Sequence, residues 1–523
     1  MGEGTTVAVI GLGALGLVSL KNLAEEGYVV TGFERNGYVG GLWNYTEEDK
    51  TSVLQSTIVN ISKERGCFTD FPFERDVSSY PSAAEVQAYL LNYVDHFKLS
   101  PNIRLNTCVK QVRRDQVRNK WALDIEGAGP EHFDKVVIAI GMNSIPNIPV
   151  VEGIESFGGV CVHSRAFKRP DDFVGKKVLI VGLGNTGADT ATSLIGYAEE
   201  IFIAHREGTI ILPRVVDGKS LDHSVNFRLT KLQDFMNDHF PDFAEKNLNK
   251  FVKKIQDKAF TIDPKWNLSP APSLKQSVPV VSDTLVTAFE SGSVQPVSAL
   301  RKVVQENAVE LADGTHLAVD SIIWCTGYKT HFGLVEDEYD PTKRTTAQWA
   351  ASRGSNGKPL PRLYQNIFSL ERPDSLAFMG TVAFPNPAFQ IYDLASMALA
   401  QVWKGRSSLP SRASMEAAVD AHHEWVCGLA RRGSVYPGIV KPQEWMRWVN
   451  EAAGTGVDEY LGYGWKGWAF WAREPRFCNL LMTGIYSPHV FRVFDGKKKK
   501  WDGARLAIER ANEDVKMKKV KLL

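Results

Sequence analysis

Two glycine-rich turns in the sequence have the spacing of nucleotide-phosphate sites. GLGALG occupies residues 11–16, and GLGNTG occupies residues 182–187. In this pattern one glycine permits a tight bend, one lets backbone N–H groups approach a pyrophosphate, and one lets the next helix pack on the strand. The N-terminus of that helix adds N–H groups and partial positive charge. We therefore expect cofactor contacts from Gly11, Gly13, Ala14, Leu15 and Gly16 in the first turn, and from Gly182, Gly184, Asn185, Thr186 and Gly187 in the second.

The residue that ends the next strand indicates which nucleotide each turn binds. After the first turn this residue is Glu34, whose carboxylate can accept hydrogen bonds from ribose hydroxyls and would repel a 2′-phosphate. That favours FAD or NAD. After the second turn the equivalent position falls near Arg206, whose guanidinium suits the 2′-phosphate of NADPH. One such turn alone is weak support for a nucleotide site. Two turns with chemically distinct partners predict an FAD domain followed by an NADPH domain.

The elements around both turns repeat one layout. A short apolar strand at residues 5–10 is followed by the first turn, a helical stretch and a second strand that ends at residue 34. Residues 176–206 repeat this order. Two such units predict an α/β fold with two doubly wound, Rossmann-like dinucleotide-binding domains.

The remaining patterns suggest where the two domains begin and end. The similar segments 134–141 and 320–328 each read as a strand that returns the chain to its sheet. A polar helical pattern between them predicts a helical insertion at about residues 217–279. We expect a discontinuous FAD-binding domain, residues 1–163 with 326–523, and an NADPH-binding domain at 164–325.

Composition excludes several functional classes. The chain has 523 residues, is 44% hydrophobic, and carries a net charge of +1, so no general attraction to nucleic acid is implied. It lacks an apolar run long enough for a membrane anchor, and its start lacks the layout of a signal peptide. None of its six cysteines forms a CxxC pair, which argues against a metal site or a redox dithiol. We expect a cytoplasmic enzyme.

Motifs along nearly the whole chain resemble those of the flavin-containing monooxygenase family. They include GLGALG with Glu34, GGLW at 40–43, VNISKERGCFTDFPF at 59–73, GLGNTGAD at 182–189, ILPR at 211–214, CTGY at 325–328, and KKWDGARLAIERAN near the C-terminus. The most specific is FGGVCVHSRAF at 157–167, which fits the family pattern FxGxxxHxxx(F/Y/W). The lysine-rich C-terminus resembles that of a soluble, microbial-type member.

The resemblance implies a reaction and residue roles. Reduced FAD reacts with O₂ to give a C4a-hydroperoxyflavin, which transfers one oxygen atom to a soft nucleophile, an amine nitrogen or a sulfur, of a small molecule. NADPH supplies the electrons. Asn60 carries over as the catalytic residue beside the flavin and nicotinamide. Gly41, Leu42, Trp43 and Ile61 would contact FAD, Thr186 and Gly187 the NADP pyrophosphate, and Arg206 the 2′-phosphate, with Arg214 as a further NADP contact.

Three alternative functions stay open. One is a Baeyer–Villiger monooxygenase acting on a ketone, although Lys168 after Phe167, and GGLW in place of GGTW, favour the N/S-oxygenating branch. The others are an uncoupled NADPH oxidase or reductase and a non-catalytic flavin-binding scaffold. His163 is interpreted as a hinge residue between the domains, since the chemistry needs no general base there. The oligomeric state stays open, with a homodimer as one option, and the sequence does not determine the substrate.

Overall fold

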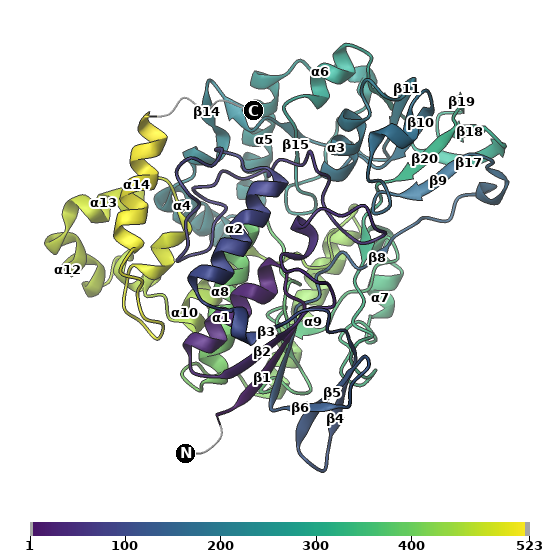
Figure 1. Ribbon diagram of the computed structural model, residues 1–523. Helices are drawn as coiled ribbons and strands as arrows, with labels where there is room; N and C mark the ends of the chain where they lie inside the picture. The colour runs from purple at the N-terminus through teal and green to yellow at the C-terminus, as the bar shows by residue number, and fades with distance from the viewer. Residues whose placement is uncertain (1–3, 518–523) are drawn as a thin grey trace.

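Two separate β-sheets form the framework of the molecule. The computed structural model describes residues 4–517 and, for side chains, residues 4–516. The first sheet has the strand order β22-β23-β24-β7-β1-β2-β3, and the second has the order β16-β11-β10-β20-β9. They lie in different parts of the molecule, with β1 and β2 low in the centre of Figure 1 and β10 and β11 at its upper right. The predicted fold of two doubly wound α/β units is confirmed.

In each sheet a parallel apolar strand runs into one of the glycine-rich turns. β1 (Thr6–Ile10) lies between β2 and β7, and β10 (Lys177–Val181) lies between β11 and β20, all in parallel register. Both strands are almost wholly buried because helices cover both faces of a parallel sheet. The other strands of the first sheet are β2 (Val29–Phe33), β3 (Ile103–Arg104), β7 (Lys135–Ile138), β22 (Leu363–Tyr364), β23 (Phe368–Ser369) and β24 (Leu376–Phe378); those of the second are β9 (Val160–His163), β11 (Glu200–Ala204), β16 (Gln295–Val297) and β20 (Ser321–Trp324).

Smaller sheets and the helices complete the two units. The short strands are β4 (Val109–Asp115), β5 (Lys120–Ile125), β6 (Glu131–Phe133), β8 (Ile145–Pro146), β12 (Ile211–Leu212), β13 (Val215–Val216), β14 (Lys219–Ser220), β15 (Val280–Val281), β17 (Leu300–Gln305), β18 (Ala308–Leu311), β19 (His316–Ala318) and β21 (Tyr328–Lys329). The helices are α1 (Ala14–Glu25), α2 (Ala83–His96), α3 (Asn185–Ser193), α4 (Phe227–His239), α5 (Pro241–Ala259), α6 (Leu285–Glu290), α7 (Ala347–Ala350), α8 (Ala388–Trp403), α9 (Arg412–Ala430), α10 (Pro442–Ala453), α11 (Val457–Tyr460), α12 (Trp465–Arg473), α13 (Pro475–Thr483) and α14 (Ala504–Met517).

The chain passes between the two units along paired segments. β8 leads out of the first unit and pairs in antiparallel fashion with β21, which leads back. β9, at the end of the segment expected in the first domain, is an edge strand of the second sheet. The expected boundary after residue 163 therefore assigns β9, a strand of the second sheet, to the first domain, and the domain bounds stay a prediction.

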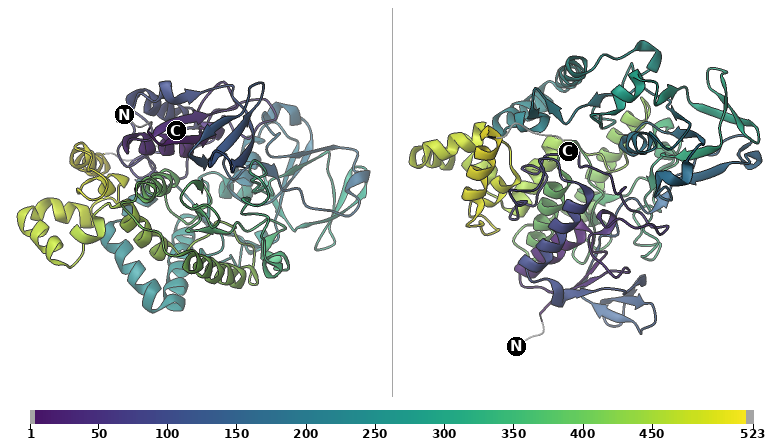
Figure 2. Two further views of the ribbon diagram at one scale, coloured as in Figure 1. Left: turned by 90° about the horizontal axis from the view of Figure 1, so that it is seen from below. Right: turned by 45° about the horizontal axis from the view of Figure 1, so that its top comes forward.

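Two helices occupy the segment in which an insertion was expected. α4 and α5 pack against each other, and α4 also contacts α10 and α13 of the C-terminal part. Figure 2 shows these helices in teal beside the yellow-green C-terminal helices. The 217–279 segment thus connects the second unit to the last quarter of the chain.

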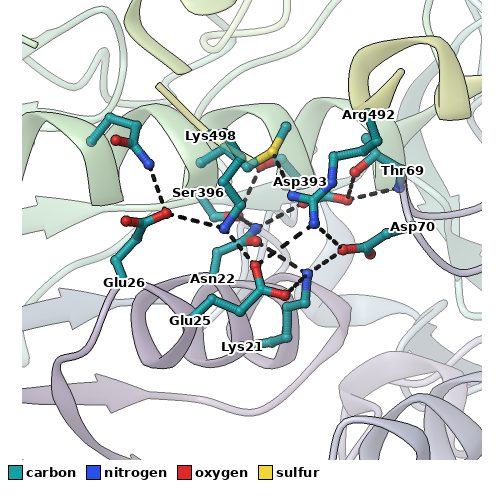
Figure 3. A network of polar contacts seen from close by, with 12 residues as sticks. Lys21, Asn22, Glu25, Glu26, Thr69, Asp70, Asp393, Ser396, Arg492 and Lys498 are labelled. Carbon is teal, nitrogen blue, oxygen red and sulfur yellow. Dashed lines mark hydrogen bonds and ion pairs between the residues drawn. The ribbon is translucent and has the colours of Figure 1, made fainter. Parts of the chain in front are cut away.

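A buried ionic network fixes the helix that follows the first glycine-rich turn. Lys21 of α1 pairs with Asp70, and Arg492 contacts the same carboxylate at 2.8 Å (Figure 3). Lys498 reaches Glu25 at 2.5 Å. Burial opposes ionisation of Asp70, but the charges of Lys21 and Arg492 outweigh it and lower the pKa of that carboxyl. The C-terminal segment thereby ties α1 to the segment of residues 59–73.

A second set of contacts in Figure 3 joins that segment to α8. Asp393 of α8 accepts hydrogen bonds from the Asn22 side chain at 2.8 Å and from the Thr69 backbone N–H at 2.7 Å. α1 and α8 pack along one another in the largest apolar core. Within residues 4–517, no helix is both long and apolar enough to span a bilayer.

Candidate functional site

The first glycine-rich turn is tightly packed. Gly11 has φ +92°, and a Cβ there would lie 2.7 Å from the Ala139 carbonyl oxygen. A Cβ on Gly16 would collide with the carbonyl of Gly11. α1 begins after Gly13 with no side-chain cap and no acidic residue in its first turn. A phosphate bound at this turn would therefore contact backbone N–H groups and the positive end of the α1 dipole, and these are the groups that a dinucleotide site provides.

Glu34 is already oriented by the protein. The side chain is 5% exposed, and Oε2 accepts the Leu12 N–H at 2.9 Å. Oε1 accepts the backbone N–H and the side-chain amide of Asn36, both at 2.9 Å. Each carboxylate oxygen has two lone pairs, so Oε1 is fully used and Oε2 can accept one further hydrogen bond from a ribose. This geometry fits the adenosine half of FAD.

The second turn repeats this geometry but is more open. Gly182 has φ +116°, and a Cβ on Gly187 would collide with the Gly182 carbonyl, as in the first turn. Nothing lies within 4 Å of a Cβ placed on Gly184. Arg206, two residues beyond β11, is exposed, and its Nη2 donates to Asn356 Oδ1 at 3.1 Å. These residues fit an NADP(H) that enters from solvent.

A cavity of about 330 Å³ lies where residues of the two units meet. Its lining combines residues predicted for FAD with residues predicted for NADPH. Trp43 forms part of the wall and makes an edge-to-face contact with Phe389 at the start of α8, with ring centroids 6.4 Å apart. The predicted site residues in this wall are Leu42, Trp43, Asn60, Ile61, Asn185 and Thr186.

Arg214 holds Asn60 in the wall of this cavity. The arginine is 7% exposed, and its Nη2 donates to Asn60 Oδ1 and to the Ile58 carbonyl, both at 2.9 Å. Its Nε donates to the Val59 carbonyl at 2.9 Å, and Nη1 pairs with Asp283 at 2.9 Å. A guanidinium can only donate, so it fixes the oxygen of the Asn60 amide toward itself. The Asn60 Nδ2 has no acceptor among the described residues and is left for a bound molecule.

Arg214 was predicted to contact NADP. Its buried contacts place it behind Asn60, with four of its N–H groups committed to protein acceptors. Contact with NADP stays an untested prediction. Sequence reasoning did not foresee that Arg214 positions Asn60, because the two residues are far apart in the chain.

The residues after Asn60 are also held in place. Ser62 is held by Asp222, because its backbone N–H and its hydroxyl donate to the Asp222 carboxylate at 2.9 and 3.0 Å. Lys63 donates to the carbonyls of Glu74, Arg75 and Val77 at 2.6–3.0 Å. The motif NISKE therefore presents Asn60 on a rigid segment.

Asp189 is a carboxylate in the cavity wall that the sequence analysis did not single out as a site residue. It lies one turn after Asn185 on α3, and its carboxylate has no hydrogen-bond donor in residues 4–516. Burial raises its pKa to about 6, although the charge of Arg214 acts in the opposite direction. A sequence signal existed, because the residue belongs to GLGNTGAD, but its exposure to the cavity required the fold.

His163 sits at the crossing between the two units. Its Nε2 lies 3.0 Å from the Gly327 carbonyl, and its Nδ1 accepts the Arg165 N–H at 3.1 Å. The ring therefore carries its proton on Nε2, and burial lowers its pKa, which favours the neutral form. The ring also meets Tyr328 edge to face. These contacts support the interpretation of His163 as an ordering residue.

The structure thus gathers some predicted residues and separates others. Glu34 lies beside the first-turn glycines, Arg206 lies two residues beyond β11, and Asn60 lines the cavity with Trp43 and Thr186. Arg206 lies outside the cavity wall. The residues that sequence reasoning missed are Asp189, Phe389 and Tyr328 in the wall.

Two dinucleotide turns, each after a buried parallel strand in its own sheet, define a two-nucleotide fold. The family model of flavin-binding monooxygenase-like proteins matches residues 4–522, so the chain belongs to this family. It is a flavin-containing monooxygenase that uses FAD and NADPH, and the residues of both turns fit these cofactors. The predicted family and cofactors are confirmed.

Curated relatives cover nearly the whole chain. Monooxygenase aurF of Gibberella zeae is 47% identical over 97% of this chain and 98% of its own length. Human flavin-containing monooxygenase 5 is 30% identical over 98% of this chain and 92% of its own.

Solved structures share the fold at lower identity. The S-allyl-L-cysteine S-oxygenase of Allium sativum superposes with a TM-score of 0.62 at 21% identity, covering 98% of both chains. Cyclohexanone monooxygenase from Rhodococcus bound to NADP⁺ gives 0.59 at 18% identity, covering 88% of this chain and 99% of its own.

Proposed function

We propose that this enzyme transfers one oxygen atom from O₂ to an amine nitrogen or a sulfur atom of a small-molecule substrate. Bound FAD supplies the oxygen-activating chemistry, and NADPH supplies the electrons. The observation that carries the proposal is the arrangement of Asn60, held by Arg214 in a cavity that Trp43 and α3 also line. A cytoplasmic location and the absence of a nucleic-acid partner belong to the same proposal.

The cavity suits this chemistry because its wall is mainly apolar. Trp43, Phe389 and Val59 exclude water, and a dry wall limits the loss of reduced flavin to side reactions. The Asn60 Nδ2 offers a fixed hydrogen-bond donor either to the oxygen that reacts at the flavin or to the amide group of the nicotinamide. No cluster of His, Cys, Asp and Glu able to hold a metal occurs in residues 4–516.

Among the relatives, the S-allyl-L-cysteine S-oxygenase is named for oxidation at sulfur and the dimethylaniline monooxygenase of Pan troglodytes for N-oxide formation. These names support a soft nucleophile as the substrate class. The choice between nitrogen and sulfur is not part of the proposal.

The test is NADPH oxidation against a panel of amines, thioethers and ketones, with the mass of each product measured. We expect a gain of one oxygen atom on an amine or a thioether. Esters from ketones with untouched thioethers would instead indicate Baeyer–Villiger chemistry. Stoichiometric H₂O₂ with every compound would indicate an uncoupled oxidase.

The role of Asn60 is tested by Asn60→Ala. We expect normal reduction of the flavin by NADPH but more H₂O₂ formed per NADPH oxidised, because the fixed donor is lost and the electrons pass to O₂ without oxygenation of substrate. Asn143→Ala is the matched control, since Asn143 lines the same cavity without contacting Arg214. Equal coupling in wild type and Asn60→Ala would contradict the assignment.

A further inference from the structure

Two positive side chains lie at one short turn of residues 355–358. Arg206 donates to Asn356 Oδ1 at 3.1 Å, and Lys358 lies two residues further along the same turn. The turn closes through a hydrogen bond from the Lys358 N–H to the Ser355 carbonyl at 3.0 Å. Arg206 comes from the NADPH-binding unit, whereas Lys358 comes from the chain segment after β21.

The turn is rigid rather than a freely moving loop. Asn356 has φ +49° and Gly357 has φ +67°, so both adopt the left-handed conformation. The indole N–H of Trp349, a fully buried side chain, donates to the Lys358 carbonyl at 2.6 Å. The backbone of Lys358 is therefore fixed. The Lys358 ammonium lies close to Gly327, since it is 3.4 Å from the position that a Cβ on Gly327 would occupy.

Neither cation has a carboxylate partner. In the described part of the chain no Asp or Glu oxygen lies within 4.0 Å of Arg206 or Lys358, although Lys358 is only partly exposed. Burial, and then the charge of Arg206, lower the pKa of the Lys358 ammonium. Two like charges held at one turn without a counter-charge repel each other, and an anion between them relieves that cost.

The place of this pair identifies the anion. Arg206 follows β11, the strand next to the one that leads into the second turn, where the adenosine ribose of a dinucleotide lies in this fold. Gly327 follows β20 at the same carboxyl edge of the sheet. We propose that Lys358 and Arg206 together bind the 2′-phosphate of NADPH, so that this phosphate bridges the two parts of the chain.

The inference deepens the assignment of Arg206 and rests on it. Arg206 alone is an exposed side chain, whereas Lys358 is a half-buried cation whose backbone is fixed in the turn that Arg206 contacts. A 2′-phosphate held from both sides would connect the NADPH unit to the segment around η7 (Arg353–Ser355). NADH, which lacks that phosphate, would leave the two cations unscreened.

The test uses the FAD-loaded enzyme and calorimetric titration with 2′,5′-ADP, NADP⁺ and NAD⁺. Lys358→Met should raise the Kd for 2′,5′-ADP and NADP⁺ by about tenfold or more, as loss of a charge-assisted contact does, and should leave NAD⁺ nearly unchanged. Lys358→Arg should retain most of the affinity. Lys135→Met is the matched control, because Lys135 is also half-buried but lies at the start of β7.

The outcomes separate this inference from its basis. If Arg206→Ala weakens 2′,5′-ADP binding but Lys358→Met does not, the role of Lys358 is refuted and that of Arg206 stands. If neither substitution has an effect, both assignments fail. An equal loss for NADP⁺ and NAD⁺ would place Lys358 at the pyrophosphate and overturn the proposal. Lys358→Gln provides the same readouts should the Met variant lose its FAD.

Discussion

The two glycine-rich turns share one backbone geometry but differ in how far the protein has completed each site. In both turns a Cβ on the last glycine would strike the carbonyl of the first, at Gly16 and at Gly187. The carboxylate beside the first turn, Glu34, is buried and accepts three hydrogen bonds from the chain. The charged groups beside the second turn, the side chains of Asp189 and Lys358, make no hydrogen bond and no ion pair within 4.0 Å among the described residues.

This difference teaches which cofactor the protein retains and which it exchanges. A site whose polar groups are satisfied by the protein costs little to keep organised, and suits a resident FAD. A site with unsatisfied charges is costly without its ligand and gains most when the ligand arrives. The open second turn therefore suits a cofactor that must bind and leave in each cycle.

The largest expected effect comes from adding one methyl group to each turn. Gly16→Ala should yield protein without FAD, because α1 is buried along most of its length and cannot shift. Gly187→Ala should retain FAD but raise the KM for NADPH by about tenfold, in line with a cost of about 1–3 kcal/mol for overpacking. Flavin absorbance and steady-state kinetics measure the two effects. FAD loss in both variants would contradict the difference between the turns.

A smaller but still large effect is expected where the two units share Arg214. Arg214→Met leaves the Asp283 carboxylate with only the backbone N–H of residue 214 as a donor among the described residues and releases Asn60, and should lower the free energy of unfolding by about 3 kcal/mol. Urea unfolding measures this loss, and H₂O₂ release should rise at the same time. Arg206→Ala is the control, since an exposed arginine should leave the unfolding midpoint unchanged. A stable Arg214→Met enzyme with normal coupling would refute the positioning role.

The smallest effect is a gain of stability at Asp189. Burial raises the pKa of this carboxyl from 3.8 to about 6, so the folded protein binds the proton more tightly than the unfolded chain. The resulting penalty is absent below about pH 3.8 and complete above about pH 6, with an upper limit of about 3 kcal/mol. Asp189→Asn should therefore raise the Tm of the NADP-free enzyme at pH 8 more than at pH 5.

The control for this prediction is Asp171→Asn, an exposed carboxylate that should give no pH-dependent change in Tm. A Tm difference that stays constant from pH 5 to pH 8 would show that Asp189 is not held in a desolvating environment. Adding NADP⁺ should reduce the advantage of the Asn variant if the cofactor supplies hydrogen-bond donors to the carboxylate.

Local patterns predicted the features that depend on neighbouring residues in the chain. The apolar strands before Gly11 and Gly182, the turn geometry and the helices after them all follow from short-range sterics. Glu34 and Arg206 could be identified because each lies within two residues after the end of the strand that follows its turn. The family motif around His163 likewise identified the crossing between the units.

Contacts between distant segments could not be predicted in this way. Nothing in the local sequence shows that Arg214 reaches Asn60, that Arg206 reaches Asn356, or that Arg492 contacts Asp70. These pairs depend on how the second half of the chain folds back over the first, and periodicity carries no information on that packing.

The sequence by itself determined the class of fold, the two dinucleotide turns and the different charges that follow them, because each depends on residues within one βαβ unit. Tertiary structure alone decided which polar groups are satisfied. Glu34 is completed by its own turn, whereas Asn60, Asp189 and Lys358 acquire their surroundings from elements far away in the chain. Burial removes water from a charged group wherever distant segments meet, and it is this desolvation that leaves the second site dependent on its ligand.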